Sequence, residues 1–216
     1  MAGTVSSLPM GYDGPQVETA LKNPAISKML DDILGKEGGK SRNKADRGGE
    51  TNLGVSLRYA RGIGLDLDGD GDTDAEDVWL VTPEIARKLY VVDFYLSPSF
   101  SLLPGTIQPF MFDFAVNSGA GRATIELQEM LNILRSSMSA AGRDVSGWPR
   151  LIADGRVGRQ SAAAAKAAET YTNGRLVNHL CDARQTYVQR IADTDPSQVQ
   201  FLAGWTNRIN TFRLED

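Results

Sequence analysis

The sequence predicts a mainly α fold, for three reasons. Apolar residues recur at helical spacing in several segments of the 216-residue chain. Two of these segments begin with a capping residue followed by proline, at Asn23 and at Thr82. Runs that alternate between apolar and polar residues, which are typical of strands, are scarce. We therefore expect helices along most of the chain, with one irregular region in the N-terminal third.

The irregular region lies between two expected helices. Residues 1–14 are rich in Gly and Ser and predict a flexible lead-in. A helix is expected from Asn23 to Glu37, with an apolar face formed by Ile26, Met29, Leu30, Ile33 and Leu34. Glycines follow this helix directly, and residues 40–54 have no periodic pattern. That stretch predicts a loop with at most a short hairpin.

Further helices are expected along the rest of the chain. A short one around residues 55–61 precedes an acidic segment, and another begins at Thr82. The later helices are expected within 106–134, as a pair joined at 117–121, and within 154–170, 173–192 and 199–212. We divide the chain into a lead-in (1–20), a part that contains the irregular region (21–104) and a helical part (105–216), and we expect the last two to share one core.

Composition excludes several classes of protein. The chain has one cysteine, so it forms no internal disulfide. No stretch approaches the ~20 apolar residues of a membrane helix, and the N-terminus lacks the basic and apolar regions of a secretory signal. Seven of the 27 acidic side chains lie between Asp66 and Asp77, and the remainder of the chain is mildly basic. That balance suits an anionic polymer, although it is a weak indication.

The acidic segment has the spacing of a calcium-binding loop. Calcium takes six to eight oxygen ligands from a chain that wraps around it, and a glycine permits the sharp turn. Gly71 stands at position 6, and Asp72 at position 7 can offer its backbone carbonyl. Positions 1, 3, 5, 9 and 12 are Asp66, Asp68, Asp70, Asp74 and Asp77. Because the chain has only one such loop, we expect one structural Ca²⁺; the alternative is a solvated acidic loop.

The upstream loop holds candidate catalytic residues. Glu37 follows an apolar helix and precedes two glycines, an environment that can raise the pKa of a carboxyl and suit it to general acid catalysis. Asp46 and Thr51 follow at short intervals, and the glycines around them allow the chain to fold back. From spacing alone, the structural alternative is favoured, in which Glu37 is a solvated acid at a helix end and Asp46 forms a turn.

An ordered set of motifs favours a catalytic role for these residues over a structural one. In chain order they are "EGG", "ADRGGETNLGVS", "VTPEIARKLY", "LLPG", "FDFAVNSGAGRATIELQEML", "DGRVGRQS" and "FLAGWTNRI". The set resembles the glycoside hydrolase family 108 lysozymes of bacteriophages and prophages, from about Leu21 to Arg213. The resemblance implies a lysozyme-like fold with a C-terminal peptidoglycan-binding segment. It also implies that Glu37 is the catalytic acid and that Asp46 and Thr51 support it. The calcium loop resembles those of dockerin modules.

The sequence departs from the family pattern in two places. Lys40 follows the "EGG" motif, where the family commonly has an aromatic residue. The acidic segment 66–77 is interpreted as an insertion that most members lack. The first difference could alter how a sugar stacks at the cleft.

Further residues are candidates for binding peptidoglycan glycan strands. Asn117 and Ser118 lie in a stretch that lines the groove of the resembled family, although they could simply cap a helix. Arg156 and Arg159 stand in a turn resembling one of peptidoglycan-binding segments, where they could contact wall carboxylates; an ordinary turn capped by Asp154 is the alternative. Four aromatic residues could stack on sugars or pack in the core: Tyr59, Tyr95, Trp148 and Trp205.

The expected function is hydrolysis of the β-1,4 bond between N-acetylmuramic acid and N-acetylglucosamine. Two rivals remain: a lytic transglycosylase acting on the same bond, and a non-catalytic, calcium-dependent wall-binding protein. We expect a monomer with no nucleic-acid partner and no membrane insertion. The lack of a signal favours an endolysin that accumulates in the host cytoplasm and is released by a separate membrane pore, a holin.

Overall fold

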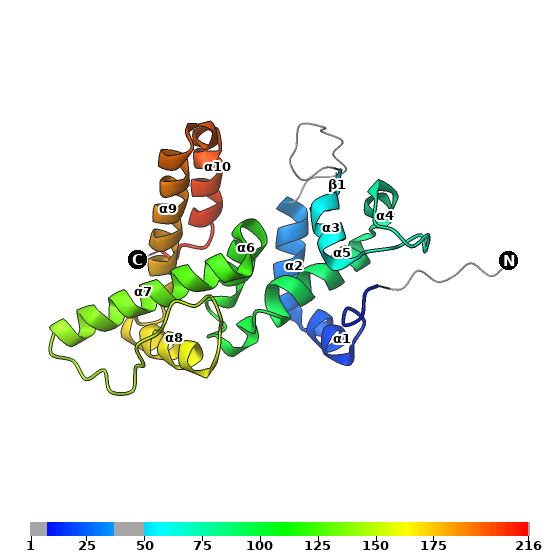
Figure 1. Ribbon diagram of the computed structural model, residues 1–216. Helices are drawn as coiled ribbons and strands as arrows, with labels where there is room; N and C mark the ends of the chain where they lie inside the picture. The colour runs from blue at the N-terminus through cyan, green and yellow to red at the C-terminus, as the bar shows by residue number, and fades with distance from the viewer. Residues whose placement is uncertain (1–7, 37–49, 216) are drawn as a thin grey trace. The chain divides into compact units, whose positions relative to one another are not determined.

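The computed structural model describes residues 8–36 and 50–215, and helices make up most of these ranges (Figure 1). The mainly α fold expected from the sequence is confirmed. The chain divides into two compact units, Met1–Asp93 and Phe94–Asp216. The first unit therefore ends before the boundary at residue 104 that the sequence suggested. Within the described ranges, no helix combines the length and apolarity needed to cross a bilayer.

The first unit contains short helices and one small sheet. Two expected helix starts are confirmed, because Asn23 accepts the backbone N–H of Ala25 at 2.9 Å and Thr82 accepts that of Ile85 at 3.2 Å. The helices are α1 (Pro15–Lys22), α2 (Pro24–Lys36), α3 (Leu57–Ile63), α4 (Ala75–Leu80) and α5 (Pro83–Val91). A π-helical turn, η1 (Val92–Leu96), continues α5 across the end of the unit.

Helix α1 occupies part of the segment expected to be a flexible lead-in. Pro15 stands in its first turn, and Val17 and Ala20 are buried on the face that packs against α2 and α5. These two small apolar residues stand three apart, which is one turn of helix. The pattern is too short to predict a helix by itself, and packing stabilises it.

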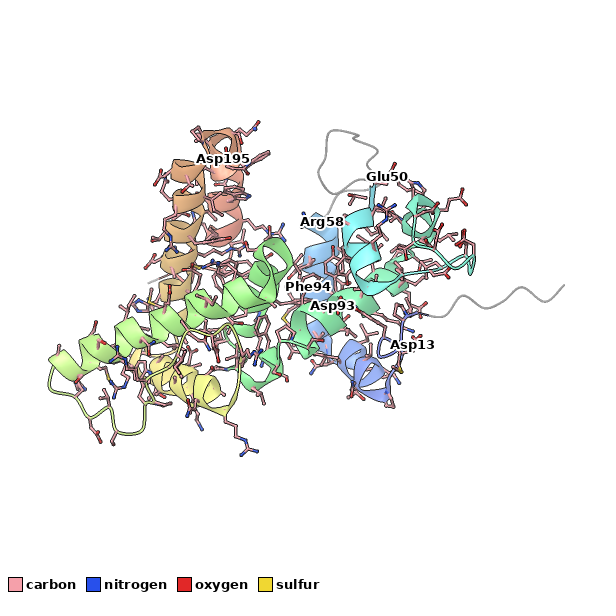
Figure 2. The ribbon with its side chains drawn as sticks, viewed as in Figure 1. Asp13, Glu50, Arg58, Asp93, Phe94 and Asp195 are labelled. Carbon is pink, nitrogen blue, oxygen red and sulfur yellow. The ribbon has the colours of Figure 1, made fainter. Side chains whose placement is uncertain are left out.

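Two tyrosine hydroxyls converge on Asp93, which ends the first unit and is labelled in Figure 2. Tyr12 donates to both carboxylate oxygens at 2.8 and 2.9 Å, and Tyr59 of α3 donates to one of them. The pKa of Tyr59 is raised by burial first, and then by the hydrogen bond to Asp93 and its negative charge. The pKa of Tyr12 is raised by the same causes in the same order. The cluster ties the N-terminal segment and α3 to the end of α5.

This cluster predicts a loss of stability at alkaline pH. The ordinary tyrosine pKa is 10.0, and the folded state raises it, so the stabilisation is complete below pH 10 and declines as the pH rises above it. Tyr59→Phe removes one titrating group and should make that decline shallower by up to about 1.4 kcal/mol per pH unit. Urea unfolding between pH 8 and pH 11 measures the slope. Tyr171→Phe, at an exposed tyrosine, is the control; equal slopes for both variants would contradict the assignment.

The second unit is a bundle of longer helices. The expected pair of helices joined near residue 119 is present as α6 (Gln108–Ser118) and α7 (Ala120–Ala140), with Gly119 between them. The other helices are a 3-10 turn η2 (Phe100–Leu102), α8 (Arg159–Tyr171), α9 (Leu176–Thr194), a 3-10 turn η3 (Pro196–Gln198) and α10 (Val199–Asn210). In Figure 1, α9 and α10 lie side by side, and η3 connects them.

A buried ionic cluster joins three helices of this unit. Asp113 of α6 accepts from Arg184 of α9 at 2.8 Å and from Arg208 of α10 at 2.9 Å. The side chains of Asp113 and Arg184 are only 2% and 4% exposed. The guanidinium of Arg184 also lies over the Phe114 ring, at 4.6 Å from its centroid. Burial lowers the pKa of Arg184, and the Asp113 carboxylate opposes that shift.

Candidate functional site

The described residues include one of the three predicted catalytic side chains. Glu37 and Asp46 lie outside the described residues, so their roles remain predictions. Thr51 begins strand β1 (Thr51–Asn52), which pairs with β2 (Val55–Ser56) in an antiparallel hairpin. The short hairpin that the sequence allowed is therefore present, at the C-terminal end of the predicted catalytic loop.

The hairpin that carries Thr51 has a constrained turn and a fixed anchor. Leu53 and Gly54, its two turn residues, have φ angles of 51° and 76°. Positive φ at both positions is the geometry of a type I′ turn, which matches the twist of the strands. Asn52 is buried, and its amide donates to the carbonyls of Val78 and Val81, both at 3.0 Å. Thr51 is therefore next to a residue locked to the end of α4.

The acidic segment forms an exposed loop on two buried leucines. Leu65 and Leu67 alternate with the first aspartates and point into the core, where both are buried. This alternation directs the neighbouring carboxylates outward. Two groups of three carboxylates gather in the loop, and inside each group one oxygen per residue lies within 4.8 Å of the others: Asp66, Asp68 and Asp70 in the first, and Asp72, Asp74 and Asp77 in the second. The two groups follow one another in the chain and hold the aspartates at the six predicted positions.

Backbone hydrogen bonds shape this loop. Asp66 accepts the N–H groups of Gly69 at 2.6 Å and Gly71 at 3.0 Å, which curls the chain around its carboxylate. The buried Asp77 accepts from Leu67 and closes a capping box with Asp74 at the start of α4. Asp77 therefore stabilises the loop and the helix independently of any ion.

Crowding of negative charge raises the pKa of two aspartates of the loop. The pKa of Asp72 is raised, first by the negative charge of Asp70. For Asp68, the backbone N–H of Asp70 lowers the pKa, but desolvation and the charges of its acidic neighbours outweigh that effect, so its pKa is raised. A bound cation would relieve this repulsion. The donor set, entirely oxygen, fits Ca²⁺.

Asn117 and Ser118 line a cavity of about 160 Å³ within the second unit. Tyr187 and Ile191 of α9 form one wall, and Gln198 and Trp205 contribute from η3 and α10. The amide of Asn117 donates to the carbonyl of Asp113 at 2.9 Å. The structure therefore brings together the two polar residues that the sequence suggested with aromatic residues that lie far away in the chain.

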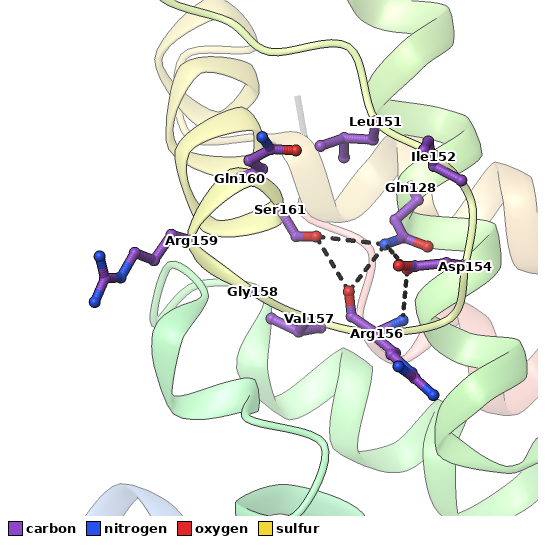
Figure 3. Close-up of a pocket in the computed structure, with 10 residues that line it drawn as sticks. All are labelled: Gln128, Leu151, Ile152, Asp154, Arg156, Val157, Gly158, Arg159, Gln160 and Ser161. Atoms are coloured by element: carbon purple, nitrogen blue, oxygen red, sulfur yellow. Dashed lines mark hydrogen bonds between the residues drawn. The ribbon is translucent and has the colours of Figure 1, made fainter.

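Arg156 and Arg159 belong to a loop around a second cavity, of about 340 Å³ (Figure 3). Their side chains extend outward from the loop in Figure 3. The groups that converge are Gln128, Asp154 and Ser161: the Gln128 amide donates to the Asp154 carboxylate at 2.9 Å and lies 3.4 Å from the Ser161 hydroxyl. Both arginines are thus presented to solvent at the rim of the cavity.

The buried Gln128 of α7 holds this loop in place. It accepts the N–H of Gly155 at 3.0 Å and donates to the carbonyl of Arg156 at 3.0 Å. Gly155 has a φ of +75°, and a Cβ there would lie 3.1 Å from the carbonyl oxygen of Gly121, so glycine is required. The Gln128 hydrogen bond, followed by the Arg156 N–H, lowers the pKa of Asp154. The motif is therefore a fixed platform, as well as a turn capped by Asp154.

The remaining candidates have mainly structural surroundings. Trp148 and Tyr95 are buried, and Tyr59 is bound to Asp93, so these three are not free to stack on a sugar. Trp205 is half-buried and lines the smaller cavity. Cys181 is buried, and desolvation raises its pKa to about 11, which leaves it an unreactive thiol.

Two family models and a solved structure match this chain. Residues 30–119 match the family model described as Glycosyl hydrolase 108, and residues 122–210 match the one described as Predicted Peptidoglycan domain. The chain therefore contains a glycosyl hydrolase 108 region followed by a peptidoglycan region. The solved structure of SagA from Brucella abortus is similar, with a TM-score of 0.62 and 25% identity over 87% of this chain and 90% of that chain. None of the curated proteins matches.

The two matched regions divide the candidate residues between them. The glycosyl hydrolase 108 region contains Glu37, Asp46, Thr51, the acidic segment and the Asn117–Ser118 pair. The peptidoglycan region contains the platform with Arg156 and Arg159. The protein is therefore a glycoside hydrolase that acts on peptidoglycan, which is its substrate or partner.

Proposed function

We propose that the enzyme is a lysozyme that hydrolyses the β-1,4 bond between N-acetylmuramic acid and N-acetylglucosamine. The observation that carries the proposal is the joint presence, in one chain, of a glycosyl hydrolase 108 region with Glu37 and a peptidoglycan region. A hydrolase with its own wall-binding part acts on an insoluble polymer, where retention on the surface raises the local substrate concentration.

Glu37 is the proposed general acid. It stands immediately after α2, whose last residues are Gly35 and Lys36, and directly before two glycines. A protonated carboxyl at this position donates its proton to the leaving glycosidic oxygen. As charge develops on the sugar ring, Asp46 and Thr51 stabilise it or orient the attacking water.

The role of Asp46 decides the stereochemical outcome. If Asp46 activates water as a general base, the two carboxyl groups should stand roughly 6.5–9.5 Å apart and the anomeric centre should invert. Thr51 is fixed in β1 and can position that water through its hydroxyl. Its placement beside the anchored Asn52 supports a positioning role.

Incubation of the purified enzyme with permeabilised cells or isolated cell walls tests the proposal. Turbidity should fall, and new reducing ends should accumulate in proportion. A protein that sediments with the walls and releases no reducing ends would be a wall-binding protein without catalytic activity, and would contradict the proposal.

We propose that this lysozyme is a phage or prophage endolysin. The support is the resemblance of its ordered motifs to those of phage lysozymes. In this role a monomeric enzyme accumulates in the host cytoplasm and reaches the wall through a separate pore.

We also propose one structural Ca²⁺ in the segment from Asp66 to Asp77. The two neighbouring groups of carboxylates and the raised pKa of Asp72 support the site. The ion would be held by the aspartate oxygens and would offset their mutual repulsion. Through α4 and the Asn52 hydrogen bonds, the loop is linked to the hairpin that carries Thr51.

Removal of calcium should lower thermal stability more than activity. A ligand that binds only the folded state stabilises it by about 2.7 kcal/mol at a hundredfold excess over Kd. We expect excess EDTA to lower the melting temperature by several degrees relative to added Ca²⁺. Activity at low temperature should fall less, because no proposed ligand touches the sugar.

A matched pair of variants separates calcium from general charge effects. Asp70→Asn should abolish the response to EDTA, whereas Glu76→Gln, an exposed acid of the same segment that is not a proposed ligand, should keep it. Asp77 is unsuitable as the diagnostic position because it also caps α4. Superimposable melting curves with and without EDTA, together with no metal in elemental analysis, would leave the segment a solvated acidic loop.

A further inference from the structure

The cavity beside Asn117 and Ser118 is built from both matched regions of the chain. Asn117 and Ser118 end α6 in the glycosyl hydrolase 108 region, whereas Tyr187, Gln198 and Trp205 belong to the peptidoglycan region. All of them lie within the second compact unit. The local sequence pattern does not predict this cavity, because the residues that form its two sides lie about seventy or more positions apart in the chain.

The walls of the cavity are held rigidly. Arg184 lines it and is fixed by its hydrogen bond to Asp113 at 2.8 Å. Tyr187 packs against Phe114, with ring centroids 5.6 Å apart. Trp205 packs against Phe201, with centroids 5.9 Å apart and ring planes 34° from parallel. Rigid aromatic walls lower the entropic cost of binding a ligand.

The lining combines the chemistry that an acetamido sugar requires. Trp205 and Tyr187 are half-buried aromatic residues, whose faces suit the apolar face of a pyranose ring. Val188 and Ile191 provide an apolar surface for the acetyl methyl group. The side-chain nitrogen of Asn117 donates a hydrogen bond to the backbone carbonyl of Asp113. The amide oxygen of Asn117 can accept a hydrogen bond from a ligand. The hydroxyl of Ser118 can donate or accept.

A second cavity, of about 360 Å³, shares Tyr187 and Ile191 with the first. It is lined by Arg122, Arg190 and Asp195, the last of which lies at the turn after α9 (Figure 2). Both arginines pair with the single carboxylate of Glu126, at 3.6 and 2.8 Å. The two cavities therefore adjoin at Tyr187 and Ile191, and charged side chains line the second one.

We propose that the cavity between the end of α6, α9 and α10 is a saccharide subsite that takes one N-acetylated sugar residue of the glycan strand. This inference rests on the proposed function in one respect, that the substrate is the peptidoglycan glycan. It adds Tyr187, Trp205 and the apolar α9 residues to the glycan-contacting surface. It also places that surface where the hydrolase region meets the peptidoglycan region.

The test is direct binding of two trisaccharides that differ in one group. The β-1,4-linked N-acetylglucosamine trimer carries acetamido groups, whereas cellotriose has the same linkage and lacks them. Calorimetric titration of the full-length protein should show binding of the acetylated trimer and at least about tenfold weaker binding of cellotriose. Equal binding of both sugars, or of neither, would overturn the inference.

Variants locate the binding. Trp205→Ala should weaken binding of the acetylated trimer by about tenfold, which is the size of a lost aromatic contact. Tyr171→Ala, at an exposed aromatic residue of α8, should leave binding unchanged. Ser118→Leu, which fills the cavity instead of enlarging it, gives a second reading if the tryptophan variant does not fold. Full affinity in folded Ser118→Leu protein would overturn the inference.

The binding assay and the cell-wall assay test the two proposals independently. A protein that binds the trimer at this cavity but releases no reducing ends from cell walls would contradict the proposed function and leave the subsite intact. A protein that degrades walls normally, with trimer binding unaffected by the cavity variants, would contradict the subsite alone.

Discussion

Glu37→Gln should reduce the rate of cell-wall hydrolysis by about 10²–10⁴-fold, the usual contribution of a general acid. Glutamine keeps the size and polarity of the side chain but has no proton to transfer at the required pKa. Glu37 lies in the sequence between α2 and the hairpin, and the near-isosteric change should leave the two compact units folded.

The experiment needs a measure of binding beside the measure of rate. Release of reducing ends from purified walls gives the rate, and co-sedimentation with the same walls gives binding, which should stay at the wild-type level. Glu50→Gln, a nearby acid with no proposed role, is the matched control. A Glu37→Gln enzyme that keeps more than about a tenth of the wild-type rate would show that the acid lies elsewhere.

Asp113→Ala should be the most destabilising single change in the second unit. The substitution leaves two guanidinium groups, Arg184 and Arg208, without the carboxylate that lies between them. Breaking a buried ion pair by removing one partner costs about 3–5 kcal/mol, because the remaining charge stays desolvated. That is a large share of the stability of a typical domain.

A surface pair of the same kind provides the control. Asp182 pairs with Arg213 at 2.7 Å, and both side chains are well exposed, so Asp182→Ala should cost less than about 1 kcal/mol. Urea unfolding of the two variants against the wild type measures the difference. Similar losses for both would show that the buried cluster contributes no more than a surface pair.

Local sequence signals predicted the helices well. Asn23 and Thr82 cap helices as expected, and Gly119 separates α6 from α7 within the predicted joint. Each of these signals acts within one turn of helix, so neighbouring residues suffice to identify it. In the acidic segment the aspartates form two groups of three, and the Ca²⁺ that their spacing indicates stays a prediction.

Contacts between distant residues could not be predicted in the same way. Tyr12 and Asp93 are 81 residues apart, and Asp113 and Arg208 are 95 apart, yet each pair forms a short hydrogen bond. Nothing in the periodic pattern marks these partners, since periodicity reports which face of a helix is buried and not what it meets.

The smaller cavity shows the same limit in the candidate site. Tyr187 and Ile191 stand at helical spacing on the same side of α9 as the buried Leu176. Such a pattern in a sequence indicates packing in the core. In the structure this face leaves the core toward the end of α9 and lines a cavity. The signal that could have indicated this is Trp205, an aromatic residue that its helix leaves half-exposed.

Mass spectrometry of the fragments released from purified peptidoglycan tests the central claim most directly. Hydrolysis of the proposed bond yields fragments that end in reducing N-acetylmuramic acid and that gain the mass of two hydrogens on borohydride reduction. Fragments that end in 1,6-anhydromuramic acid, lighter by one water and resistant to reduction, would show a transglycosylase, and reducing N-acetylglucosamine ends would show cleavage of the other glycosidic bond. Either result would contradict the assignment of this protein as an N-acetylmuramidase.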